Sequence, residues 1–307
     1  MIKQTIIALL CFLAPLTGQA QSPDAGTVEV FAGAELNYAD VNFLRLYNVL
    51  VNVTPGVKWH LGHDWLVAGQ LFLPAVNYGY DNKHNIVRLT NATLAKQLHF
   101  GRQHFKLTGG LFGRDRYGLD LRWMMPATDW LMLEAQVGYT GAWRLAAADA
   151  LDWTWDAYPI ETKAVNFDAP DRLTAIVGAN VWLSPWNTQF RLTAGRYLNL
   201  DYGTELQVMR HFRGCSVGLF AQLHEKQSVG RRYPTEAGGF RVVVCLPDWH
   251  WTSGKLKVRP ASNFRLTYNA QADGISMQNY TTDPEENERD YPVRIPWGTG
   301  SMTHATR

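Results

Sequence analysis

Five acidic residues lie in stretches where polar and apolar residues alternate, a placement that allows paired carboxylate chemistry. The five are Glu29, Glu35, Asp120, Glu134 and Glu205. Two facing carboxyl groups can hydrolyse a glycosidic bond, one as acid and the other as base or nucleophile. The alternative is a set of structural charges balanced by bases in the same kind of stretch. Those bases are Lys58, Lys106, Arg122, Arg191 and Arg241, and their presence favours the structural interpretation.

Other signatures of catalysis or metal binding are missing from the sequence. The nine histidines show no His-x-x-x-His or His-Glu-x-x-His spacing. The glycine-rich stretch "TGGLFG" at 108–113 lacks the Gly-Lys-Ser/Thr ending of a phosphate-binding loop. We therefore expect no enzymatic activity, no cofactor and no metal site.

An aromatic cluster in "DWTWDAY" is the best candidate for ligand binding. Trp153, Trp155 and Tyr158 would offer ring faces beside carboxylates, an arrangement on which sugar rings can stack. The alternative is that this loop packs against the rest of the molecule or against another subunit.

Period-two alternation dominates the chain and indicates the strands that must position these residues. "WLMLEAQVGY" at 130–139 sets Leu131, Leu133 and Val137 against Glu134 and Gln136. We expect twelve strands, near 27–37, 45–61, 64–76, 86–99, 104–113, 117–125, 130–143, 174–183, 188–199, 203–212, 215–224 and 239–247.

The connectors alternate between two lengths. Tight turns such as Gly62-His63-Asp64 alternate with long polar loops at 77–85, 146–172 and 224–239. Short periplasmic turns opposite long outer loops are typical of an outer-membrane barrel. The sequence therefore predicts an all-β, transmembrane, antiparallel up-and-down β-barrel of about 12 strands in the outer membrane of a Gram-negative bacterium.

The ends of the chain predict secretion and a tail. Residues 1–20 carry Lys3, an apolar core and a small-x-small site before Gln21, as in a signal peptide. We expect the barrel at 21–250 and a periplasmic, partly disordered extension at 251–307. The 29 Lys and Arg residues nearly balance 27 Asp and Glu residues, which argues against nucleic-acid binding.

The alternation also predicts which side chains face the lumen. The lumen charges are expected to be Glu35, Lys106, Asp120, Arg122, Glu134, Arg191, Glu205 and Arg241. With twelve strands and such long side chains, we expect a narrow or plugged interior. Several tryptophans near strand ends should form an aromatic girdle: Trp59, Trp65, Trp123, Trp130, Trp143, Trp182 and Trp186.

Cys215 and Cys245 are expected on opposite faces of the wall and therefore without a mutual disulfide. A fifteen-residue stretch occurs twice, "LTGGLFGRDRYGLDL" from Leu107 and "LTAGRYLNLDYGTEL" from Leu192. Each copy should form one hairpin, with Asp120 and Glu205 as equivalent inward acids that pair with bases in the lumen.

These motifs also resemble a known family. "VRLTNATLAKQL", "RLTAGRYLNLDYGTELQVMRHFRGCSVGLFA", "GGFRVVVCLP" and "KLKVRP" are similar, in order, to stretches of YjbH-like exopolysaccharide (capsule) biosynthesis proteins, over about residues 45–260. The resemblance implies an outer-membrane barrel, here a short single-barrel member, that assists assembly or export of surface exopolysaccharide. The alternative is a structural or general diffusion porin without a polysaccharide role. The partners implied are outer-membrane lipid, surface polysaccharide and proteins of an export system.

Overall fold

The computed structural model describes residues 25–39, 48–79, 82–145, 165–212, 214–228, 231–246, 249–270 and 277–285. The expected signal peptide lies outside these ranges. So do the three aromatic residues Trp153, Trp155 and Tyr158.

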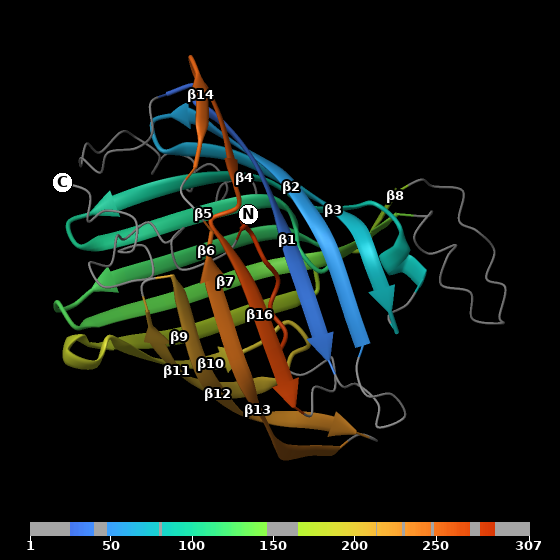
Figure 1. The fold of residues 1–307 in the computed structure, drawn as a ribbon. Coiled ribbons are helices and arrows are strands. Elements are labelled where there is room, and N and C mark those ends of the chain that lie inside the picture. Colours follow the sequence, from blue (N-terminus) through green and yellow to red (C-terminus); the bar gives the residue numbers. More distant parts are fainter. Residues whose placement is uncertain are drawn as a thin grey trace, which may run out of the picture.

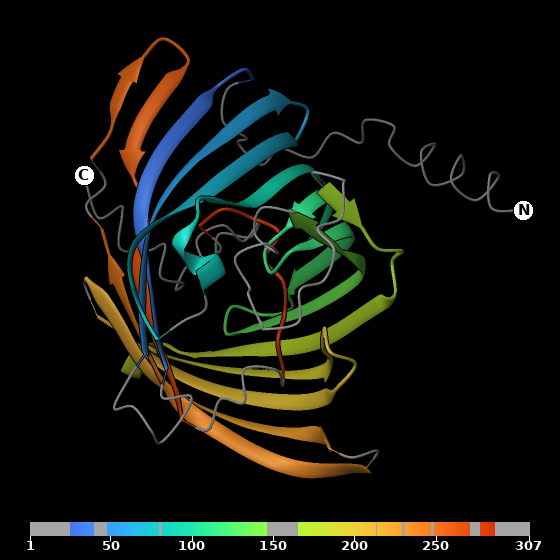
Figure 2. The ribbon, with the colours of Figure 1, turned by 90° about the vertical axis from the view of Figure 1, so that its right-hand side faces the viewer.

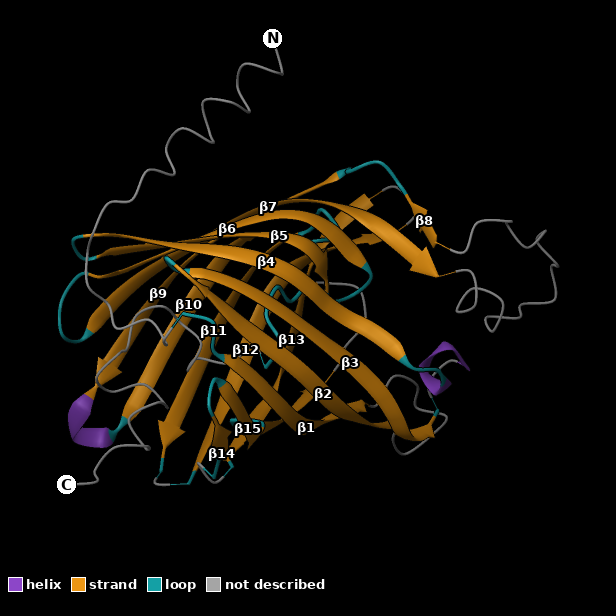
Figure 3. Cartoon of the chain, turned by 90° about the horizontal axis from the view of Figure 1, so that it is seen from above, coloured by secondary structure: helices purple, strands orange, loops and turns teal. Residues whose placement is uncertain are grey.

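Thirteen strands form a closed barrel (Figures 1 and 2). They are β1 (Val28–Ala39), β2 (Asn48–Gly62), β3 (Trp65–Tyr78), β4 (Arg88–Phe100), β5 (Gln103–Phe112), β6 (Arg116–Pro126), β7 (Leu131–Leu145), β9 (Arg172–Leu183), β10 (Thr188–Arg196), β11 (Tyr202–His211), β12 (Cys215–Ser228), β13 (Arg231–Cys245) and β16 (Asn263–Ala270). Three short strands flank the barrel: β8 (Val165–Phe167), β14 (Trp251–Ser253) and β15 (Leu256–Pro260). Two 3₁₀ turns, η1 (Asn82–Asn85) and η2 (Ser184–Trp186), lie in connections between strands (Figure 3).

The predicted fold class is confirmed, and the strand count exceeds the expected twelve by one. The additional strand, β16, lies beyond residue 250, where we expected the barrel to end. It pairs antiparallel with β13 and parallel with β1, with Leu266 opposite both Val242 and Leu36. An odd number of alternating strands must meet in one parallel pair, so the antiparallel pattern fails at this single seam.

The seam contains a break in register. Pro260 of β15 lies opposite Ala32 of β1, and Leu266 of β16 lies opposite Leu36. Between these two pairs the chain advances six residues from Pro260 to Leu266 but only four from Ala32 to Leu36. The two extra residues between β15 and β16 form a bulge. Within the bulge, the Ala261 N–H still donates to the Ala32 carbonyl at 2.7 Å.

Alternation along each strand sends polar groups inward and apolar groups outward. Asn52, Asn91, Thr108, Thr140 and Asn180 are fully buried on the inner face. Large apolar side chains such as Leu119, Val177, Leu219 and Leu223 are more than half exposed on the outer face. Among the described residues, no helix has the length and apolar character needed to cross a membrane.

Exposed aromatic residues border this apolar surface at both ends. Trp59, Phe100, Trp130 and Trp186 lie near the tight turns, and Tyr78, Tyr139 and Tyr202 lie near the opposite rim, each at least 41% exposed. An apolar band between two aromatic girdles is the surface of an outer-membrane barrel. This surface agrees with the predicted location in a Gram-negative outer membrane.

Two of the expected girdle residues lie elsewhere. Trp143 and Trp182 are 3% and 4% exposed. Trp182 lies near the His211 ring, at a centroid distance of 5.0 Å, in the same inward row of side chains as Asn180. The sequence interpretation placed them by nearness to a strand end, whereas the parity of each position along the strand decides its face.

One of the connections that we expected to be a long loop is not a loop. The segment expected as a long loop at 224–239 instead extends the β12–β13 hairpin, in which Leu223 pairs with Glu236 and Ser228 with Arg231. The same hairpin sets Cys215 opposite Val244. Cys215 and Cys245 form no disulfide with each other, as expected from their opposite faces.

The repeated sequence forms two equivalent hairpins. In β5–β6, Thr108 pairs with Asp120 and Gly110 with Gly118, and in β10–β11, Thr193 pairs with Glu205 and Gly195 with Gly203. Every pair in the second copy is shifted by the same 85 residues. Asp120 and Glu205 are therefore structural equivalents on the inner wall.

Candidate functional site

The barrel interior is occupied by a part of the chain itself. Residues Met277–Glu285 run inside the ring of strands, as the view along the barrel shows (Figure 2). Tyr280, Thr282 and Asp283 are 1%, 0% and 6% exposed. We call this stretch the inner segment. It belongs to the extension that we expected to be periplasmic and partly disordered.

The outer end of the inner segment is held by the β10–β11 connection and the β5–β6 turn. The Met277 N–H donates to Asp201 Oδ2 at 2.5 Å, and the Leu198 N–H donates to the Gln278 carbonyl at 3.0 Å. The Gly113 N–H donates to the Thr281 carbonyl at 2.8 Å. These backbone bonds satisfy groups that would otherwise be buried without partners.

Tyr280 is the central anchor. Its ring stacks on Phe112 with centroids 5.3 Å apart, and Leu198 completes a small apolar cluster. Its hydroxyl donates to Asp120 Oδ1 at 2.7 Å. Gly138 leaves room for this hydroxyl, because a Cβ there would lie 1.5 Å from it. Burial and the neighbouring Asp120 carboxylate both raise the pKa of Tyr280, which keeps the hydroxyl a donor.

Amides of the wall continue this contact. Gln136 Nε2 donates to Asp120 Oδ1 at 2.7 Å, while Gln136 Oε1 accepts from Asn279 Nδ2 at 2.7 Å. On the other side, Asn91 Nδ2 donates to the Thr281 carbonyl at 2.8 Å. The inner segment is thus bonded to strands β4, β6 and β7.

Farther along the segment, an acidic residue meets a buried lysine. Asp283 Oδ1 lies 2.5 Å from Lys106 Nζ, and both side chains are less than a tenth exposed. Burial alone would raise the pKa of Asp283, but Lys106 and Arg122 outweigh it and lower the pKa to about 2. The carboxylate is therefore ionised in its place.

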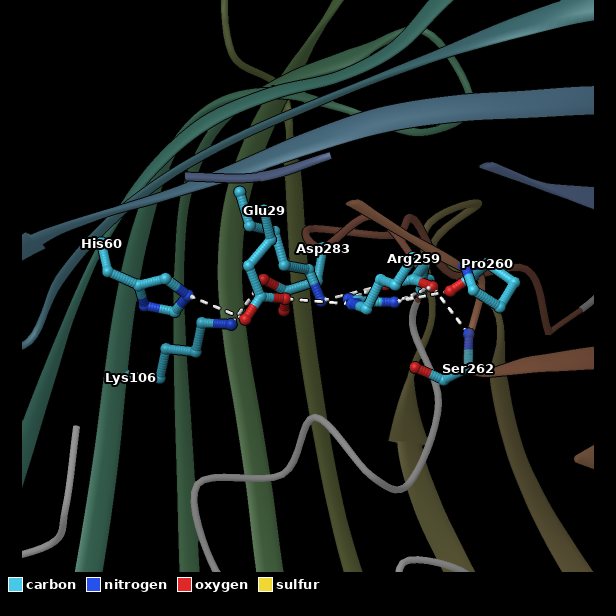
Figure 4. Close-up of polar contacts among 9 residues, drawn as sticks. Glu29, His60, Lys106, Arg259, Pro260, Ser262 and Asp283 are labelled. Carbon is cyan, nitrogen blue, oxygen red and sulfur yellow. Dashed lines mark hydrogen bonds and ion pairs between the residues drawn. The ribbon is translucent and has the colours of Figure 1, made fainter. Parts of the chain in front are cut away.

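The last described residue binds at the seam. Arg259 donates from Nη1 and Nη2 to the two carboxylate oxygens of Glu285, at 3.0 and 2.8 Å. The Ser262 N–H donates to Glu285 Oε1 at 2.8 Å, and Lys58 Nζ lies 3.6 Å from Oε2. Figure 4 shows Arg259 and Ser262 beside Pro260, with Lys106 and Asp283 nearby.

The surroundings orient the Arg259 guanidinium. Its Nε donates to Glu29 Oε2 at 3.1 Å, and its plane lies over the Phe31 ring at 5.1 Å. Lys58 approaches the same ring at 5.8 Å. Gly56 makes room for Phe31, since a Cβ at position 56 would lie 2.3 Å from the ring. Two cations and one buried ring thus form a prearranged group.

The remaining predicted lumen charges lie in pairs on the wall. Arg191 Nε is 2.7 Å from Glu134 Oε1, Arg241 Nη1 is 3.0 Å from Glu205 Oε1, and Arg122 Nε is 3.3 Å from Asp120 Oδ2. Glu35 Oε2 accepts from Asn52 Nδ2 at 3.1 Å. Each of these acids is thus bonded to a base or an amide of the wall.

A buried histidine forms a separate polar cluster on strands β10, β11 and β12. His211 Nδ1 lies 2.8 Å from Ser216 Oγ, and its Nε2 lies 3.1 Å from Gln189 Oε1. Ser216 is fully buried, so this His–Ser contact has no access for a substrate. Across the described ranges, no group of three or more His, Cys, Asp and Glu side chains is arranged to hold a metal ion.

The sequence interpretation identified the wall side of this site and missed the segment side. It named Lys106, Asp120 and Arg122, but not Tyr280, Asp283, Glu285 or Arg259. The available signal was the group of three acids in "TTDPEE" at 281–286, directly after the aromatic residue Tyr280. The contacts join positions as far as 230 residues apart, so local periodicity could not reveal them.

Comparisons with known proteins find only distant likeness of fold. The Pseudomonas aeruginosa protein OccK2 (OpdF), in complex with glucuronate, matches with a TM-score of 0.37 and 11% identity, over 74% of this chain and 66% of that one. Pseudomonas aeruginosa OpdK with vanillate matches with a TM-score of 0.36 and 10% identity, over 74% of this chain and 67% of that one. No protein-family model and no curated protein matches the sequence.

Proposed function

We propose that this protein is an outer-membrane channel whose passage its own C-terminal segment blocks. The observation that carries the proposal is the inner segment, which lies buried within a closed barrel and is bonded to strands on several sides. The polar inner wall supports a water-filled passage once the segment leaves, because amides, hydroxyls and charges line it. The chain is then a gated, porin-like barrel.

A disulfide that locks the segment tests this function. A Cβ on Gly113 would lie 3.3 Å from Thr281 Cβ, close to the spacing of about 3.5–4.5 Å in disulfides. The double variant G113C/T281C should therefore link β5 to the inner segment. We expect the oxidised protein to give no channel current in planar bilayers and the reduced protein to give intermittent openings.

Replacing the anchors should have the opposite effect. We expect the variant Y280A/D283N to conduct in a sustained manner, because it lacks the ring stack and the ion pair with Lys106. The single variant T281C, which has no partner cysteine at position 113, is the matched control for the lock. Absence of current from the reduced lock and from Y280A/D283N alike would overturn the channel proposal.

A role in surface polysaccharide assembly or export is the second candidate. It rests on the sequence motifs shared with YjbH-like proteins, including "RLTAGRYLNLDYGTEL", and no contact in the barrel adds to it. A deletion strain separates the two functions. Loss of surface glycan that G113C/T281C restores even when oxidised would favour the polysaccharide role, because the locked barrel cannot conduct.

A further inference from the structure

The inner segment places two carboxylates on a group of donors that could equally bind a free carboxylate ligand. We propose that Arg259, the Ser262 N–H, Lys58 and Lys106 form a binding site for small polycarboxylate solutes, which Asp283 and Glu285 occupy as built-in competitors. This inference rests on the proposed channel function and names the class of solute that the channel admits.

The Glu285 half of the site has the geometry of a carboxylate receptor. The two guanidinium nitrogens of Arg259 meet the two oxygens one to one, at 3.0 and 2.8 Å. Such a fork matches the planar carboxylate and makes strong, directional contacts. The Ser262 N–H adds a third donor at 2.8 Å. The Glu285 side chain is 3% exposed, so the receptor is shielded from water.

The backbone donor exists because of the seam bulge. Between Pro260 and Leu266 the register with β1 slips, and the Ser262 N–H turns to Glu285. The Ser262 carbonyl meanwhile accepts from the Leu246 N–H at 3.1 Å. Bulges commonly redirect backbone groups in this way at functional positions. Glu29 then fixes the guanidinium in the orientation that Glu285 uses.

The Asp283 half supplies the second charge. Lys106 lies within the lumen with 5% of its side chain exposed, and its ammonium group meets Asp283 at 2.5 Å. Lys58 links this pair to the Arg259 group, because it lies 3.6 Å from Glu285 and its charge also acts on Asp283. A ligand with at least two carboxylates could therefore replace both acids at once, whereas a monocarboxylate would leave one cation without its counter-charge.

Competition sets the concentration at which such a ligand acts. The inner segment is tethered to β16 through the short stretch 271–276, so its effective concentration is about millimolar or higher. Citrate at millimolar concentrations should therefore displace the segment, and citrate is the probe that we would use. Neutralising Asp283 and Glu285 removes the competing carboxylates and should make citrate bind more tightly.

The first experiment measures exposure of the segment in the full chain. Thr282 is fully buried, so a cysteine at this position reports departure of the segment from the wall. In T282C with Cys11, Cys215 and Cys245 replaced by Ser, we expect citrate to raise the rate of thiol labelling at least tenfold. Sodium chloride of equal ionic strength is the matched control and should leave the rate nearly unchanged.

The second experiment measures binding of radiolabelled citrate to the detergent-solubilised full chain. We expect D283N/E285Q to bind citrate at least tenfold more tightly than the unmodified chain. Adding R259Q or K106Q should abolish this binding, whereas R210Q, which changes an exposed arginine of β11, should retain it. If D283N/E285Q misfolds, the thiol-labelling assay still tests whether citrate displaces the inner segment.

The outcomes separate this site from the channel. Labelling that chloride raises as much as citrate, or citrate binding that survives R259Q, would overturn the carboxylate site even if Y280A/D283N conducts. Suppose that D283N/E285Q binds citrate more tightly and loses this binding when R259Q or K106Q is added, but that the barrel never conducts. This result would support the carboxylate site and overturn the channel proposal.

Discussion

Asp120 and Glu205 occupy equivalent positions in the repeated hairpins but contact different parts of the molecule. Asp120 accepts from Tyr280 of the inner segment, whereas Glu205 accepts from Arg241 and Gln222 of the wall. The repeated hairpins thus place an acid at equivalent inward positions, but the residues around each acid determine what it contacts.

This asymmetry predicts two different effects of removing a carboxylate. Glu205→Ala should lower stability by about 2 kcal/mol, because Arg241 loses a charged hydrogen-bond partner. Asp120→Ala should lower stability similarly and should also release Tyr280, which raises thiol labelling of T282C severalfold. Urea unfolding in micelles and the labelling assay measure the two effects. Equal labelling in both variants would contradict the assignment.

The lowered pKa of Asp283 predicts how binding of the inner segment to the wall depends on pH. Its pKa is lowered from the ordinary 3.8 to about 2, so docking favours the ionised form. The contribution of this carboxylate is complete above the ordinary pKa and is lost as the pH falls from about 4 to 2. We expect labelling of T282C, with a reagent that reacts in acid, to rise over this range. The variant D283N should label quickly at pH 7 and show a flatter profile.

At the scale of elements, hairpin glycines predict a graded series of effects. Gly118 has a φ of +150°, and a Cβ there would lie 2.2 Å from the Tyr139 carbonyl oxygen. Gly101, in the tight turn after β4, has a φ of +61° and open space around it. We expect Gly118→Ala to cost about 3 kcal/mol and Gly101→Ala about 1 kcal/mol. Urea midpoints of the two variants measure the difference, and equal midpoints would show that the β6–β7 backbones can separate.

Alternation and turn spacing were sufficient to predict the first twelve strands of the barrel. The same rule applies to β16, where Phe264, Leu266 and Tyr268 alternate with Arg265 and Thr267. This strand was missed because twelve strands, an even number, already gave a complete antiparallel barrel by residue 250. The inner segment has no such pattern, and its position depends on contacts made only after the wall exists.

At the scale of the whole molecule, the odd strand count determines where the chain leaves the wall. After thirteen crossings, Ala270 lies at the rim opposite the tight turns, where it pairs with Gly238. We expect epitope tags inserted after Asn82 or Ala270 to bind antibody on intact cells. Tags after Gly62 or Thr128 should bind only after permeabilisation. Protection of the Ala270 tag alone would indicate that the closing strand is absent from the wall.

The parallel seam also has a consequence for biogenesis. β16 must insert between β13 and β1, and its contacts with β1 join residues 230 positions apart, such as Leu36 and Leu266. Until β16 has inserted between them, β1 and β13 remain open edges that invite pairing with other chains. We expect closure to be the last and slowest step of wall formation, since it requires the most distant contact. Periplasmic chaperones would have to protect the nearly complete chain, and ribosomal products that stop before residue 263 would aggregate rather than form smaller barrels.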